Sequence, residues 1–307
     1  MTEAILATPK LPLMKKLLIA LPCVWLLVFV LVSLLIVLKI SFSESATALP
    51  PHVPLFHFAG GWRGIEDFFT GFSLDNYRRL GSGPLYVLSY VKSLEIAAFA
   101  TLLLLVIGYP IAYGIARTSG RLQAVLIILV TLPFWIALLI RGHVWLNILQ
   151  PDGLLNRVLL AMNLVHEPPV WLGTDTAVYV GLVYSYLPFM VVPLYAVLAR
   201  LDPASTEVAV DLGCPRWKAF CLITLPLSSP GVLVGVLLCF VPIAGAFVIP
   251  DLLGGSRVPM IGQAIWTEFF GNQDWPAAAA ITVVLVCLLA TPIVLFGQQA
   301  LRAVDRG

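Results

Sequence analysis

The chain has 307 residues, of which 60% are hydrophobic and only 11% are charged, and its mean hydropathy is +0.98. A soluble domain has about 45–50% apolar and about 25% charged residues, so this composition excludes an ordinary soluble protein. The formal net charge of +2, with no basic run interleaved with aromatic residues, gives no indication of nucleic-acid binding. We therefore expect a membrane protein.

Six apolar segments follow one another along the chain. Each is near the roughly 20 residues that cross a bilayer as a helix, and the runs are continuously apolar instead of alternating as barrel strands do. The sequence predicts an all-α polytopic membrane protein with six transmembrane helices. The third segment is the least regular, with Pro133 near its middle and Arg141 and His143 near its outer end. The six segments are Leu17–Leu38, Leu94–Tyr113, Val125–Ile148, Ala177–Leu198, Pro230–Ile249 and Ala277–Phe296.

Basic residues between the segments predict the orientation. With the N-terminus inside, ten Lys and Arg residues flank the inner ends and eight flank the outer ends, although the outer loops are longer. The positive-inside rule then places both termini in the cytoplasm. A cleaved signal peptide is the alternative at the N-terminus, but its apolar run of about 22 residues exceeds the usual 7–15.

This orientation gives a simple layout. Cytoplasmic tails at 1–16 and 301–307 enclose one six-helix domain at 17–300, with a long outer loop at about 40–90 and an inner loop at 200–226. Prolines and the Gly60-Gly61 pair indicate that the first half of the outer loop is irregular. Ser73 is a plausible N-cap of a short helix that follows it.

Residues suited to catalysis or metal binding are scattered. Three of the five cysteines lie in apolar segments and two in the inner loop, with no CxxC pair and no metal-ligand spacing among the histidines. None of the six lysines follows a glycine, so there is no Walker A loop for ATP. We expect a chain without catalytic residues, metal or bound cofactor.

The inner loop concentrates charge in a chain that has little. Asp202 precedes Pro203 as an N-cap would, and Gly213 is placed to end a first helix, Ala204–Leu212, in a left-handed conformation. A second helix, Arg216–Leu225, then ends near Pro226. Glu207 and Asp211 are four residues apart and share a face of the first helix, where Arg216 and Lys218 are candidates to oppose them. On these grounds alone a solvated amphipathic loop remains an alternative.

The spacing within this loop resembles the cytoplasmic motif of binding-protein-dependent ABC importer permeases, which runs E-A-A, three residues, G, nine residues and I-x-L-P. Val208 replaces the first alanine. The resemblance implies the type I ABC importer permease fold in a bacterial inner membrane, and a coupling region that docks on an ATPase. The positions that carry it are Glu207, Ala209, Asp211, Gly213, Ile223 and Pro226, with Arg216 and Lys218 between them.

Further motifs look like the putrescine and spermidine permeases. They include Gly108-Tyr109-Pro110, Leu139-Ile140-Arg141 and Phe247-Val248-Ile249-Pro250, although Ala246 stands where that subgroup has a glutamate. The resemblance implies a polyamine as cargo. Carboxylates combined with aromatic faces bind ammonium groups, so the candidates for the substrate path are Asp251, Trp266, Glu268, Asp274 and Trp275. Interfacial anchoring is the alternative role of the tryptophans.

The resemblance also implies partners. They are a second homologous permease, two cytoplasmic ATPases that use ATP and Mg²⁺, and a periplasmic substrate-binding protein. The same machinery could import an opine, a phosphonate or ferric iron. An ion-coupled secondary transporter is a further alternative, but the central thirds of the segments contain no Asp, Glu, Lys or Arg. We expect Glu95 to pair with Lys92 one turn earlier.

Overall fold

The structure, a computed structural model, describes residues 13–46, 50–53, 72–255 and 258–304. The predicted irregular stretch around Gly60-Gly61, most of the N-terminal tail and the last three residues lie outside these ranges. The chain divides into two compact units, and each is described by itself. One contains Met1–Asn76 and Asp274–Val283, and the other contains Tyr77–Gln273 and Val284–Gly307. The layout predicted from the sequence, one six-helix domain between two tails, stays a prediction.

The first unit contains the long helix α1 and a small hairpin. Its elements are α1 (Leu13–Ser41), β1 (Glu44–Ser45), β2 (His52–Val53) and the starts of α3 (Asp75–Ser82) and α14 (Trp275–Val304). The strands are antiparallel, with Ser45 opposite His52. Asn76 ties α3 to the chain at the end of α1, because its side-chain amide donates hydrogen bonds to the carbonyls of Ser41 and Ser43 at 3.1 and 2.8 Å.

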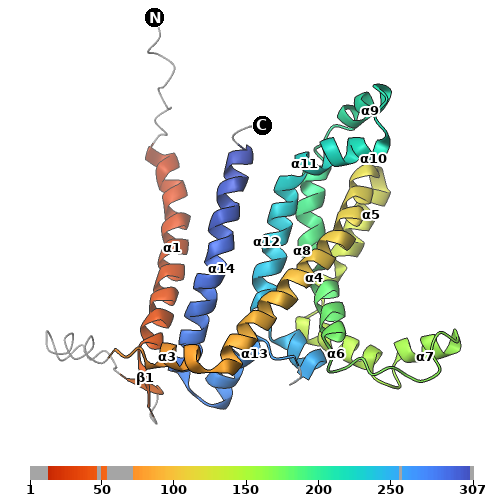
Figure 1. Ribbon diagram of the computed structural model, residues 1–307. Helices are drawn as coiled ribbons and strands as arrows, with labels where there is room; N and C mark the ends of the chain where they lie inside the picture. Colours follow the sequence, from red (N-terminus) through yellow and green to blue (C-terminus); the bar gives the residue numbers. More distant parts are fainter. Residues whose placement is uncertain (1–12, 47–49, 54–71, 256–257, 305–307) are drawn as a thin grey trace, which may run out of the picture. The chain divides into compact units, whose positions relative to one another are not determined.

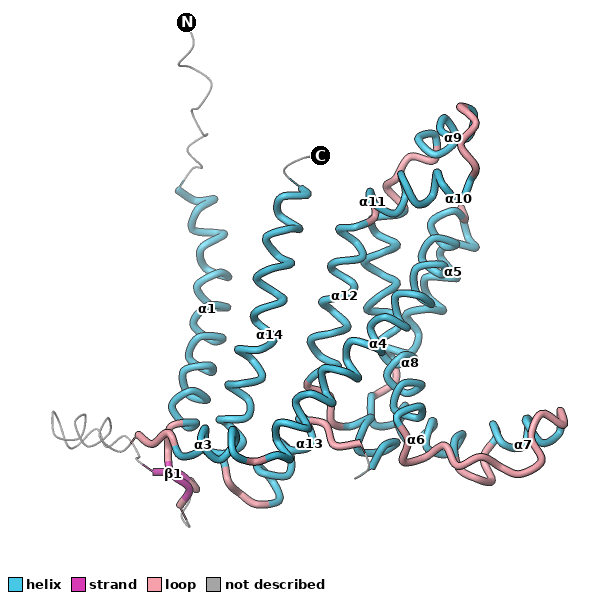
Figure 2. Tube along the Cα trace, in the orientation of Figure 1, coloured by secondary structure: helices cyan, strands magenta, loops and turns pink. Residues whose placement is uncertain are grey.

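The second unit is built mainly of helices, and the connection between α7 and α8 is a long loop (Figure 2). Helices α9 and α10 lie at one end of it, and α6 and α13 lie at the other (Figure 1). The larger elements are α4 (Pro84–Arg117), α5 (Gly120–Thr131), α6 (Leu138–Leu149), α7 (Leu154–Ala161), α8 (Asp175–Leu198), α9 (Ala204–Asp211), α12 (Ser229–Ala244) and α13 (Ile261–Trp266). The short turns are η2 (Leu132–Trp135), α10 (Arg216–Ala219), η3 (Phe220–Thr224), α11 (Leu225–Leu227), η4 (Pro250–Gly254) and η6 (Thr267–Gly271).

Helices α4, α8 and α12 pack against one another and form the core of this unit. Met190 of α8 is fully buried between two glycines. A Cβ atom on Gly108 of α4 would lie 2.9 Å from the Met190 Cγ, and one on Gly235 of α12 would lie 2.8 Å from its Sδ. Small residues let helix backbones approach closely in a membrane, where no hydrophobic effect drives helices together.

Two of the six predicted segments are not straight helices. The third is broken, and its halves Gly120–Trp135 and Leu138–Ala161 meet at 94°. Pro133 has no N–H for the helical ladder, and the chain becomes extended at Ile136. The helix of the fifth segment ends early, at Ala244, with Gly245 as its C-cap. Residues 245–247 are not helical, and helical geometry resumes at Val248.

Among the described residues, three helices are long and apolar enough to cross a membrane, and two bent pairs would bring the number to five. The described apolar part of α14, Trp275–Thr291, is shorter than this test requires. The chain is therefore a polytopic helical protein, and six crossings stay a prediction.

Helix α4 also differs from its prediction, since it begins at Pro84, ten residues before Leu94. Lys92 and Glu95 both lie within this helix and form the predicted pair. The Lys92 Nζ lies 3.4 Å from Glu95, as predicted, and 2.7 Å from Asp175 of α8, which the sequence did not indicate. The outer loop is correspondingly shorter than 40–90.

Candidate functional site

The inner loop forms the helix–turn–helix that its sequence predicts. The Asp202 carboxylate accepts a hydrogen bond from the backbone N–H of Ala204 at 2.9 Å, which caps α9. Gly213 has a φ of +89°, in the region that L-residues rarely adopt, and turns the chain toward Pro215 and α10. Ala209 is half-buried in α9.

The second helix continues farther than predicted. Helix α10 passes into the π-helical turn η3, which contains Ile223, and then into α11, which contains Pro226. At η3 the N–H of Leu225 donates a hydrogen bond to the carbonyl of Phe220, five residues back. The next residue, Pro226, has no N–H to donate. The helix then bends by 65° between Leu227 and Ser229. π-Helical turns of this kind often occur at functional sites.

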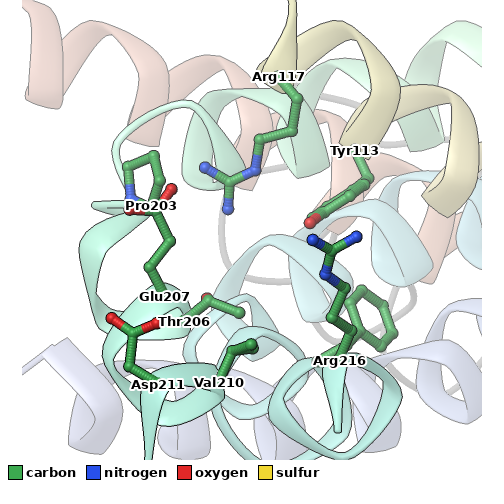
Figure 3. A pocket seen from close by; sticks show the side chains of 9 residues that line it. Tyr113, Arg117, Pro203, Thr206, Glu207, Val210, Asp211 and Arg216 are labelled. Atoms are coloured by element: carbon green, nitrogen blue, oxygen red, sulfur yellow. The ribbon is translucent and has the colours of Figure 1, made fainter.

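Helix α9, α10 and the C-terminal end of α4 border an open cavity of about 530 Å³, which we call the coupling cavity. Glu207 and Asp211 line one side of it, and Arg117 and Arg216 lie on the facing side with Tyr113 (Figure 3). The full lining is Tyr113, Arg117, Pro203, Thr206, Glu207, Val210, Asp211, Arg216 and Phe220.

The sequence predicts Arg216 and Lys218 as partners of the two acids, and among the described residues neither forms an ion pair with Glu207 or Asp211. Arg216 faces the cavity, but the Lys218 Nζ lies 5.4 Å from the centre of the Trp217 ring and does not line it. The sequence missed Arg117, whose guanidinium lies 5.2 Å from the Tyr113 ring centre. As a basic residue at the inner end of a helix, it entered the prediction of orientation alone.

Phe220 connects the inner loop at 200–226, which we call the coupling loop, to α4. Its ring packs edge-on against Tyr109 and Tyr113, with ring centres 5.7 and 5.6 Å away. Beside it, the Tyr109 hydroxyl lies 2.8 Å from the Oγ of Ser228, at the 65° bend, and both side chains are buried. Through Phe220, this loop is therefore in direct contact with the core helix α4.

Three of the five candidates for the substrate path lie at the opposite end of the second unit. Glu268, in η6, accepts hydrogen bonds from the Tyr86 hydroxyl at 2.7 Å and the Asn272 amide at 2.9 Å. Trp266 stacks on Phe247 with ring centres 4.6 Å apart and remains 47% exposed. Asp251, in η4, accepts a hydrogen bond from Gln263 of α13 at 3.1 Å.

The other two candidates, Asp274 and Trp275, belong to the first unit. Asp274 caps α14, because its carboxylate accepts a hydrogen bond from the N–H of Ala277 at 3.1 Å. The Trp275 ring stacks on His52, with ring centres 6.3 Å apart. Both residues have a structural role at the start of α14.

Comparison with known proteins gives consistent matches. Residues 105–297 match the profile of a family described as "Binding-protein-dependent transport system inner membrane component". The spermidine/putrescine transport system permease protein PotB of Haemophilus influenzae is 35% identical over 283 residues, which cover 92% of each chain. The protein of the same name from Escherichia coli is 38% identical over 229 residues, 75% of this chain and 83% of its own.

A more distant relative and a solved structure extend the comparison. The molybdenum transport system permease protein ModB of Azotobacter vinelandii is 31% identical over 182 residues, 59% of this chain and 78% of its own. A chain of a bacterial ABC transporter that imports the acidic polysaccharide alginate superposes with a TM-score of 0.71 at 16% identity, over 94% of this chain and 95% of that one. This likeness shows a shared fold.

Proposed function

The chain belongs to the family of binding-protein-dependent transport system inner membrane components, and from this premise we propose that it forms part of the path for a polyamine such as putrescine or spermidine. As a multi-pass permease of the inner membrane, it is a transport subunit. The relatives at 35–38% identity, named as spermidine/putrescine permeases, support this cargo. Opines, phosphonates and ferric iron are the alternative cargoes.

The Glu268 carboxylate is the observation that carries the proposal. Among the described residues it accepts hydrogen bonds from two neutral donors, Tyr86 and Asn272, so its negative charge is oriented but not neutralised by them. Trp266, two residues earlier, presents an exposed aromatic surface. An ammonium group gains from both a carboxylate and an aromatic face, and Asp251 supplies a second carboxylate for the other end of a diamine.

Uptake of labelled putrescine and spermidine tests this role. Glu268→Gln keeps the shape and hydrogen bonding of the side chain but removes its charge. We expect the KM for spermidine uptake to rise about tenfold, with normal amounts of protein in the membrane. Glu167→Gln, the same change at an exposed residue after α7, is the matched control. Unchanged uptake by Glu268→Gln, or uptake of an opine without polyamine uptake, would overturn the assignment.

Helix α9 supplies the docking surface for an ATPase in this proposal. Away from the coupling cavity it exposes Val208 and, at its end, Leu212, which are 56% and 84% exposed, and Trp217 of α10 is 64% exposed. Large apolar side chains at the aqueous end of a membrane protein indicate a protein partner. The motif residues Glu207, Asp211 and Gly213 shape the same loop.

The assembly follows from the same proposal. Two ATPases that hydrolyse ATP with Mg²⁺ bind the loops of this chain and of a second, homologous permease, and a periplasmic protein delivers the cargo. Both termini then face the cytoplasm. ATP-driven closure of the ATPases moves α9 and α10, and the helices rock between outward-open and inward-open states.

A charge placed on the docking surface tests the ATPase contact. Leu212→Asp should abolish uptake and the stimulation of ATPase activity by cargo, since a carboxylate would have to enter an apolar contact. Leu164→Asp, at a leucine that is 64% exposed in the loop after α7, is the matched control. Full coupling in Leu212→Asp would show that the ATPase docks elsewhere.

A further inference from the structure

Two hollows of the second unit meet at Phe220. The first is the coupling cavity, and the second is an apolar groove of about 640 Å³ between α4 and α12. The Phe220 side chain lines both of them, so the groove and the cavity are adjacent. The groove is lined by Leu105, Val106, Tyr109, Pro110, Phe220, Leu225, Pro226, Ser229 and Val232.

One face of α4 runs through both hollows. Leu105, Tyr109, Tyr113 and Arg117 are spaced four residues apart, so they lie on the same side of the helix. The first two line the groove and the last two line the cavity. The series passes from aliphatic to aromatic to cationic, which is the order of environments from the hydrocarbon of a bilayer to its headgroups.

The coupling cavity holds two acidic and two basic side chains. Within the part of the chain that the structure describes, no ion pair within 4.0 Å joins Arg117 or Arg216 to Glu207 or Asp211. Two guanidiniums thus face two carboxylates across a space large enough for a small ligand (Figure 3). The lining has no net formal charge, so it suits a ligand with one anionic and one cationic group.

We propose that the cavity and groove together bind a phospholipid whose headgroup carries a phosphate and a primary ammonium, as in phosphatidylethanolamine. Arg117 and Arg216 bind the phosphate, because guanidiniums form charge-assisted, often bidentate, hydrogen bonds with phosphate oxygens. Glu207 and Asp211 bind the ammonium. One acyl chain lies in the groove against Tyr109 and Leu225. Basic pockets between membrane helices are known to select lipid headgroups, and here the two acids change the selection from anionic to zwitterionic.

A lipid fits these observations better than a protein side chain does. The groove lies along α4, one of the three helices with the length and composition of a membrane span, and exposes Val106 to the surroundings at 62%. The side of α9 that is exposed to a protein partner carries Val208 and Leu212, neither of which lines the cavity. The lipid would thus hold α9 from the membrane side, independently of the cargo.

Native mass spectrometry of the full-length chain, purified with its co-purifying subunits from equimolar phosphatidylethanolamine and phosphatidylglycerol, tests the proposal. We expect phosphatidylethanolamine to be retained preferentially. Arg117→Gln combined with Arg216→Gln should lower its retention about tenfold, because the charge-assisted bonds to phosphate are lost. Glu207→Gln combined with Asp211→Asn leaves two guanidiniums alone and should shift the preference to phosphatidylglycerol.

Lys218→Gln is the matched control, since Lys218 lies outside the cavity and its variant should retain lipid as the unmodified protein does. Equal retention of both lipids by the unmodified protein, or unchanged retention in the double arginine variant, would overturn the proposal. Lipid counts are read without transport, so a failure of polyamine uptake leaves this result standing. Loss of lipid selectivity likewise leaves the cargo assignment standing.

Discussion

The Tyr109 hydroxyl of α4 lies 2.8 Å from the Ser228 Oγ, at the residue where the chain bends by 65° between α11 and α12. Ser228 also donates to the Leu225 carbonyl at 3.0 Å, so its hydroxyl joins the bend to a neighbouring core helix. Both groups are buried, and the bond has no competition from water. The bond thus joins α4 to the bend between α11 and α12.

A double-mutant cycle measures this contact. Tyr109→Phe and Ser228→Ala should each lower the Tm of the purified permease, and the double variant should fall no further than the worse single one. The coupling free energy should be about 0.6 kcal/mol, the average for hydrogen bonds between membrane helices. Fully additive losses would show that the two hydroxyls do not interact.

The close packing at Met190 predicts a contrast between two glycines of the same helix. Gly108→Ala places a Cβ 2.9 Å from the Met190 Cγ and should destabilise the protein by about 1–3 kcal/mol, the usual cost of overpacking a core. Gly114→Ala meets no atom within 4 Å and should be neutral or slightly stabilising. Thermal unfolding of the two variants in the same detergent compares them, and equal Tm values would contradict the packing.

The coupling loop was predictable because its signals are local. A cap at Asp202, a glycine at the required left-handed position and prolines at helix starts each act within a few residues, and the structure confirms them. Continuous apolar runs of about 20 residues also predict the segments that became α4, α8 and α14, since a long apolar run needs no neighbour to be helical in a bilayer.

The errors concern what depends on distant residues. Hydropathy cannot distinguish the 94° break near Pro133 from the continuous helix α8, which contains Pro188 and Pro193. Whether a proline breaks or bends a helix depends on the neighbours that satisfy its free carbonyl. The sequence did not indicate Arg117 either, since its role also depends on distant residues. It lies opposite Glu207 because α4 and α9 meet in the structure, although the two residues are 90 positions apart in the sequence.

The left-handed conformation of Gly213 predicts the outcome of replacing it. Gly213→Ala meets no atom within 4 Å, yet a φ of +89° is unfavourable for any residue with a Cβ. We expect a cost of about 1–2 kcal/mol and a reoriented α9, so cargo uptake should fall while the protein still inserts. Gly81→Ala, in α3 with open space and no such φ, should transport normally. Normal uptake in Gly213→Ala would show that the turn is not needed for coupling.

His52 makes the hairpin of the first unit sensitive to pH. It is 8% exposed, its Nδ1 has no hydrogen-bond partner among the described residues, and burial together with the nearby positive charge of Lys39 lowers its pKa below the ordinary 6.5. The folded hairpin therefore holds the proton more weakly than an opened one does. Its stability is complete above about pH 6.5 and decreases as the pH falls from there toward the lowered pKa.

Hydrogen exchange of the amides around Ser45 and His52 measures this effect. Exchange should be slow at pH 8 and, after correction for the intrinsic rate, faster at pH 5. His52→Phe keeps an aromatic ring against Trp275 but does not titrate, so its protection should be independent of pH. If the unmodified protein and His52→Phe respond to pH alike, another group controls the hairpin, because the proton on His52 is the one difference between them in this range.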